Sequence, residues 1–173
     1  MKRVVWFILS LAIATIAFAD THETPMARQL DWLAGKFQCR GTAFATPMAP
    51  EHATMADVDA NWDVDGSWIR FAYVERKTDA NPKPMFVSGF FGYDAPAKKF
   101  IVRGFDNWGG YAHGESDGMS GDALTFTGPW KMTSMTVMSR DTFKKSGRDL
   151  VHVGEVEMDG KWMKVSEETC TRK

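Results

Sequence analysis

Short segments in which apolar and polar residues alternate dominate this chain, and turn residues separate each segment from the next. Alternation with a period of two is typical of strands that bury one face. The expected strands are 35–44, 53–63, 67–77, 85–93, 98–105, 110–116, 122–129, 131–141, 149–158 and 161–171. Asp65-Gly66 and Asp159-Gly160 stand between such segments, and Asp-Gly is a strong hairpin signal. The pattern therefore predicts an all-β, antiparallel fold.

About ten strands joined mainly by hairpins predict a closed up-and-down antiparallel β-barrel. An open sheet would leave two unpaired edges, and closure removes them. With an even number of strands, the start of the first strand lies beside the end of the last. Cys39 is near the start of the first expected strand and Cys170 is near the end of the last. A barrel and a Cys39–Cys170 disulfide therefore support each other, and a two-sheet sandwich is the alternative fold.

A short amphipathic helix is expected just before the first strand. Thr24-Pro25 is typical of an N-cap followed by proline at the first helical position. Met26, Leu30 and Leu33 follow at helical spacing, and Gly35 ends the pattern.

The first residues have the pattern of an export signal. Lys2 and Arg3 precede an apolar stretch, Val4–Phe18, and Ala17-Phe18-Ala19 gives the small-x-small pattern before Asp20. A membrane anchor is the alternative, but the stretch is shorter than the roughly 20 residues of a membrane span. We expect a signal peptide at 1–19 and one domain at 20–173, located in the bacterial periplasm or secreted. Two cysteines suit such an oxidising compartment.

The charge balance excludes several classes of partner. The whole chain has a net charge of −1, and cleavage would remove two further positive charges. No basic patch for nucleic acid and no charged tail is present. No integral membrane segment is expected after cleavage. The chain holds 12 phenylalanines and 7 tryptophans, more than filling a core of this size requires.

Aromatic residues are the first candidates for a ligand site. Their rings would give area and shape to an apolar ligand inside a barrel, although each ring could equally belong to an ordinary core. The candidates for the lumen are Trp62, Phe71, Tyr73, Phe90 and Phe126. Trp108 lies in the loop 106–110 beside two glycines. That loop is expected to form either a lid at the barrel mouth or a tight turn with Trp108 folded back.

His152 and Arg140 are the polar candidates. His152 shares the parity of Leu150 and Val156, which points it toward the lumen. It could ligate haem iron or bond a polar ligand group, and the plainer interpretation is a satisfied interior histidine. Arg140 is one of three mid-strand arginines that could clamp a carboxylate, and surface placement is the default.

Recognised catalytic and metal-binding motifs are absent from the sequence. It holds no Gly-x-Ser-x-Gly, phosphate loop or dinucleotide fingerprint, and no His-x-His or Glu-x-x-His spacing. We therefore predict neither catalytic nor metal-binding residues, and a binding role over an enzymatic one.

Several segments together resemble the lipocalin-like (calycin-type) domains, and in particular a bacterial family of exported lipocalin-like barrels of unestablished function. The matching segments are Leu30-Asp31-Trp32-Leu33-Ala34-Gly35-Lys36-Phe37, Asp65-Gly66-Ser67-Trp68, Gly89-Phe90-Phe91-Gly92-Tyr93-Asp94, Asp106-Asn107-Trp108-Gly109-Gly110 and Cys170-Thr171-Arg172-Lys173. The resemblance covers roughly 28–173 and implies a lumen of ligand size, but no particular reaction.

Three functions are compatible with this sequence. The first is a barrel that binds a small, largely apolar or amphiphilic molecule in its lumen. The second is a haem-binding enzyme that acts on reactive nitrogen or oxygen species, with His152 as the axial ligand. The third is a ligand-free interaction module of the cell envelope.

Overall fold

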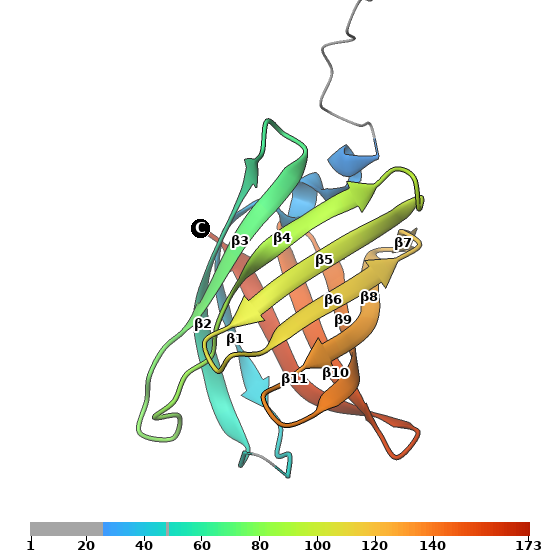
Figure 1. Cartoon of the computed structure of the whole chain (residues 1–173). Helices are drawn as coiled ribbons and strands as arrows, with labels where there is room; N and C mark the ends of the chain where they lie inside the picture. Colours follow the sequence, from blue (N-terminus) through green and yellow to red (C-terminus); the bar gives the residue numbers. More distant parts are fainter. Residues whose placement is uncertain (1–25, 48) are drawn as a thin grey trace, which may run out of the picture.

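The computed structural model describes residues 26–47 and 49–173 of the chain (Figure 1). The expected signal peptide and the Thr24-Pro25 helix start lie outside these residues. The elements are η1 (Ala27–Leu33), β1 (Gly35–Ala43), β2 (His52–Asp63), β3 (Trp68–Glu75), β4 (Phe86–Asp94), β5 (Lys99–Asp106), β6 (Tyr111–Ser116), β7 (Met119–Ser120), β8 (Ala123–Lys131), β9 (Thr136–Ser146), β10 (Asp149–Met158) and β11 (Lys161–Arg172). Within the described ranges, no helix has the length and apolar character needed to cross a membrane.

The strands form one antiparallel sheet that closes on itself. Its order is β6–β5–β4–β3–β2–β1–β11–β10–β9–β8, and β6 also pairs with β8. The short strand β7 pairs only with β8, so ten strands make the ring. The predicted closed barrel is confirmed, and the sandwich alternative is wrong.

Most strands begin and end within two residues of the expected positions, and β9 is the exception. We expected a strand over 131–141, whereas β8 continues to Lys131 and β9 covers Thr136–Ser146. A turn separates them, closed by a hydrogen bond from the Met132 backbone N–H to the Met135 carbonyl at 2.8 Å. The apolar methionines on either side of this turn gave the segment the appearance of a continuing strand.

The ring is closed at two unequal seams. Strands β1 and β11 are aligned through seven residue pairs, and Cys39 lies directly opposite Cys170. The two cysteines form the predicted disulfide, across a sequence separation of 131 residues. Strands β6 and β8 are aligned through three pairs only.

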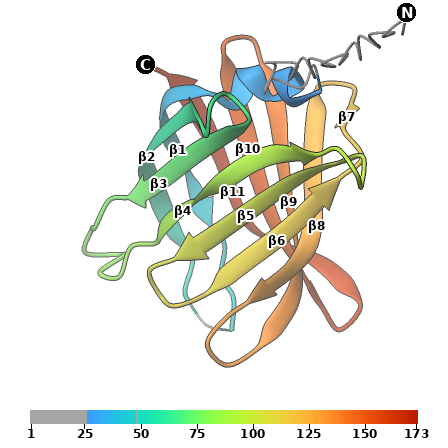
Figure 2. The same cartoon turned by 45° about the horizontal axis from the view of Figure 1, so that its top comes forward.

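One end of the barrel is closed by η1, which is a 3-10 helix (Figure 2). Its Leu30 and Leu33 are buried in the apolar core. Arg172 at the end of β11 fastens this end, since its guanidinium donates to the backbone oxygens of Ala34 and Trp32 at 2.7 and 3.0 Å. The opposite end, where the β5–β6, β8–β9 and β10–β11 turns lie, is here called the mouth.

The interior differs between its two halves. Near η1 it is packed, and Phe37, Ile69, Phe100 and Leu124 are almost fully buried. Toward the mouth, inward-facing side chains keep part of their exposure. Residues of this kind are Val58, Phe71, Tyr73, Val102, Asp141, Phe143 and His152. The inward-facing side chains of the mouth half are thus less completely covered than those near η1, and this half of the interior is here called the cup.

Candidate functional site

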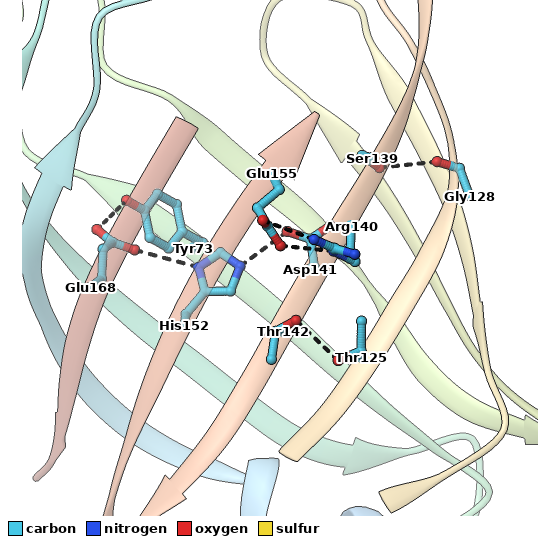
Figure 3. A network of polar contacts seen from close by, with 10 residues as sticks. All are labelled: Tyr73, Thr125, Gly128, Ser139, Arg140, Asp141, Thr142, His152, Glu155 and Glu168. Atoms are coloured by element: carbon cyan, nitrogen blue, oxygen red, sulfur yellow. Dashed lines mark hydrogen bonds and ion pairs between the residues drawn. The ribbon is translucent and has the colours of Figure 1, made fainter. Parts of the chain in front are cut away.

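Four polar side chains from four strands meet inside the cup (Figure 3). The Tyr73 hydroxyl on β3 donates to Glu168 Oε1 on β11 at 2.9 Å. Glu168 Oε2 lies 3.8 Å from His152 Nδ1 on β10, and His152 Nε2 lies 3.0 Å from Asp141 Oδ1 on β9. These residues, called here the lumen network, join both sides of the Cys39–Cys170 seam.

The strand register explains why these side chains converge. His152 is aligned with Glu168 on one side and with Phe143 on the other. Gly154 is aligned with Asp141, so Asp141 faces the same way. Because paired residues in an antiparallel sheet share a face, one register places all of them inside.

Glu168 is the most deeply buried acid of the network, with 3% exposure. Burial by itself raises the pKa of a carboxyl group. Contacts with His152 and Tyr73 outweigh burial and hold the pKa of Glu168 below its usual value. Burial and the neighbouring Glu168 and Glu75 carboxylates raise the pKa of Tyr73. Glu168 is therefore ionised at neutral pH, and Tyr73 remains a hydroxyl donor.

His152 is held in its charged form. Burial opposes the imidazolium, but the Asp141 and Glu168 carboxylates outweigh it and raise the pKa of His152 from 6.5 to about 9. Both ring nitrogens then carry protons and face carboxylates. A haem iron needs a free lone pair on one nitrogen, and this ring does not offer one.

A second buried acid, Glu75, lies two residues beyond Tyr73 on β3 and is 6% exposed. Its Oε2 accepts a hydrogen bond from the Met85 backbone N–H at 2.8 Å, and its Oε1 lies 3.7 Å from His52 Nε2. The hydroxyl of Thr54, on the neighbouring strand, is buried and makes no hydrogen bond within the described residues.

Below the network lies a cluster of phenylalanine rings. The Phe91 ring centroid is 4.6 Å from that of Phe71, 5.6 Å from Phe126 and 5.5 Å from Phe143. The Phe143 ring in turn stacks on His152 at 4.7 Å. The phenylalanine cluster and the lumen network therefore meet where Phe143 stacks on His152.

The structure brings together four of the residues proposed from the sequence. Phe71, Tyr73, Phe126 and His152 face the lumen. Trp62 also faces inward, but at the η1 end, where its indole N–H donates to Asp31 Oδ1 at 2.8 Å. Its ring is therefore part of the closed end, not of the cup.

Phe90 and Arg140 lie on the outer face. Phe90 is aligned with Arg70 and Arg103 on its neighbours, while the next residue, Phe91, takes the inward position. Arg140 makes a two-pronged ion pair with Glu155 at 2.8 and 2.9 Å, and its guanidinium stacks over the Trp162 ring at 4.4 Å. Arg140 therefore cannot bind the carboxylate group of a ligand inside the barrel.

Trp108 lies on the β5–β6 turn at the mouth. The Asp106 carboxylate accepts hydrogen bonds from the backbone N–H groups of Trp108 and Gly110, each at 2.9 Å. The Thr133 hydroxyl donates to the Trp108 carbonyl at 3.1 Å. The backbone is thus a tight turn, as one of the two expectations had it, but the indole is not folded back, since Trp108 is 50% exposed.

Sequence reasoning missed the three acids of the cup, Glu75, Asp141 and Glu168. The parity of Glu168 could have revealed it, because it is two residues from Cys170 on the same strand face. Asp141 stood at the end of a strand whose position was predicted five residues too early, so its parity carried no information.

Within the described ranges, no group of three or more histidine, cysteine or acidic side chains is arranged to hold a metal ion.

Comparison with known proteins shows the fold alone. No family model matches the chain, and no curated protein matches it. Among solved structures, the chain is similar to the crystal structure of Rv2717c from M. tuberculosis, with a TM-score of 0.66 and 13% sequence identity. The match covers 87% of this chain and 98% of that one.

Proposed function

We propose that this protein is a binding barrel that holds one small amphiphilic molecule in its cup. The ligand's apolar part would lie on the phenylalanine cluster, and its polar part would meet the lumen network. The observation that supports this most directly is the partial exposure of inward-facing side chains in the mouth half, opposite a packed half.

The chemistry of the wall supports binding more than catalysis. A general base at neutral pH needs a free lone pair and a pKa near the working pH. His152 is charged instead and faces a carboxylate on each side. The Tyr73 hydroxyl is likewise committed to Glu168. Such a network fixes the position of its members and offers their remaining acceptor sites to a ligand.

Export is part of the proposal. The expected signal peptide and the Cys39–Cys170 disulfide both support a protein that works in an oxidising compartment such as the periplasm.

A lumen-filling substitution tests the proposal. A side chain added at Gly104 would begin 3.4 Å from Val87 and 3.9 Å from Phe71, which is ordinary contact, and would extend into the cup. Gly104→Phe should therefore fold and lose the binding of a neutral apolar fluorophore such as 1-naphthylphenylamine. Titration followed by fluorophore emission gives the affinity and the stoichiometry.

The matched control is Arg103→Phe, which places the same ring on the next residue, facing outward. The wild type and this control should bind the neutral fluorophore near one to one, and Gly104→Phe at least about tenfold more weakly. Equal binding by all three proteins, or none by the wild type, would refute a ligand site in the lumen.

A further inference from the structure

We infer that the cup selects a cationic head group, an amine or quaternary ammonium carried on an apolar body. This inference rests on the proposed function and specifies the ligand class for the same site. It follows from the charges that face the open half of the lumen.

Acids outnumber bases in the cup. Glu75, Glu168 and Asp141 face inward there, and the imidazolium of His152 is opposed by two of them. His52 lies 3.7 Å from Glu75 at the rim. One carboxylate charge of the lumen network is thus left without a positive partner, before Glu75 is counted.

The basic side chains lie elsewhere. Arg140 is outside, paired with Glu155. Lys145 and Arg172 face inward only at the η1 end, where they stack on Trp32 and Phe37. Lys161 is the first residue of β11, at the rim, and is exposed. In the described part of the chain, no lysine or arginine compensates the cup acids.

Asp141 is the group best placed to meet the ligand. Its side chain is 38% exposed although it faces the lumen, so its carboxylate borders the open space. Oδ1 accepts a hydrogen bond from His152, while Oδ2 accepts none within the described residues. An ammonium N–H could take that acceptor without breaking the network.

Two further features belong to the same part of the cup. The Thr54 hydroxyl, 7% exposed, makes no hydrogen bond within the described residues and is a further polar atom for a ligand's head group. The Phe143 ring, which stacks on His152 at 4.7 Å, places aromatic surface next to the acids, and aromatic faces attract cations. A carboxylate head would instead approach like charges in a poorly solvated site, which is costly.

Matched amphiphiles test the inference. Dodecyltrimethylammonium, dodecanol and dodecanoate share one chain length and differ in charge, and each is titrated below its micelle-forming concentration by isothermal calorimetry. The wild type should bind the cation at least about tenfold tighter than the alcohol, and dodecanoate should bind most weakly. Native mass spectrometry should show one cation per protein.

Asp141→Asn removes the charge and keeps an oxygen that can accept the His152 proton. It should bring the affinities for the cation and the alcohol to within about threefold of each other. Asp122→Asn makes the same charge change on an exposed turn at the η1 end and should leave the wild-type preference unchanged.

The outcomes separate the two proposals. If all three amphiphiles bind with similar affinity, or if Asp122→Asn lowers the preference as much as Asp141→Asn, the choice of a cation is wrong and the binding barrel stands. If none of the three binds, both proposals fail.

Discussion

At the scale of single residues, the notable feature is a partly buried cation held between two acids. Glu168 and Asp141 keep His152 charged, and Glu168 is itself fixed by Tyr73 (Figure 3). Removing one member of such a group leaves another without its partner, and an uncompensated buried charge is strongly destabilising. The network therefore makes two predictions about stability.

The first prediction concerns pH. The pKa of His152 is about 9 in the folded protein and 6.5 ordinarily, so its stabilisation is fully present below about pH 6.5 and is lost as the pH rises through 9. The shift corresponds to about 3 kcal/mol. We expect the free energy of unfolding to fall by up to that amount between pH 6.5 and 10, as measured by urea denaturation.

His152→Gln should flatten this part of the profile, whereas His113→Gln on the outer face should keep the wild-type slope. A wild-type profile that is flat between pH 6.5 and 10 would contradict a charged His152.

The second prediction concerns the Tyr73 hydroxyl. Tyr73→Phe removes a donor from a buried carboxylate and should lower the free energy of unfolding by about 1–3 kcal/mol. Tyr111→Phe is the matched control, because Tyr111 is exposed on the outer face, and it should change stability by less than about 0.5 kcal/mol. Equal midpoints for the two variants in urea would show that the Tyr73–Glu168 contact contributes nothing.

At the scale of strands, alternation in the sequence predicted most faces where the strand position was right. On β10 the parity of Leu150 and Val156 placed His152 inward, and the structure does the same, because β10 pairs with β9 without a break and the irregularity beside Gly154 lies on β11. On β4 two phenylalanines are adjacent, and the prediction of Phe90 for the lumen was wrong, because Phe91 takes the inward position. Contacts across the barrel, such as Tyr73 with Glu168, depend on closure and have no signal in local sequence.

The third prediction concerns Gly89 and Gly104, which face each other across β4 and β5. A Cβ at Gly89 would lie 2.0 Å from the Arg103 carbonyl oxygen and 2.8 Å from the Phe71 ring, while at Gly104 it would meet only ordinary contacts. Gly89→Ala should therefore cost about 1–3 kcal/mol, as overpacking does, and Gly104→Ala less than about 0.5 kcal/mol. Thermal unfolding of the pair measures the difference. The reverse order of stability would mean that β4 can shift to admit the methyl group.

At the scale of the whole molecule, the disulfide joins the first strand to the last. The chain-entropy model assigns about 4–5 kcal/mol to a crosslink over so long a loop. Cys39→Ser combined with Cys170→Ser should thus lower the free energy of unfolding by about 2–5 kcal/mol. Guanidinium denaturation of this variant, beside the wild type with and without reductant, measures the loss. A variant as stable as the oxidised wild type would show that strand pairing alone holds the seam.

The difference between the two seams also predicts where the barrel opens locally. Seven aligned pairs and a covalent bond hold β1 to β11, whereas three pairs hold β6 to β8. Local opening draws on the least stable pairing, so amide hydrogens of β6 and β8 should exchange with deuterium before those of β1 and β11. Local opening between β6 and β8 would widen the cup beside the Trp108 turn and give a bulky ligand a side entrance. The disulfide-linked strands β1 and β11 and the lumen network would stay in place.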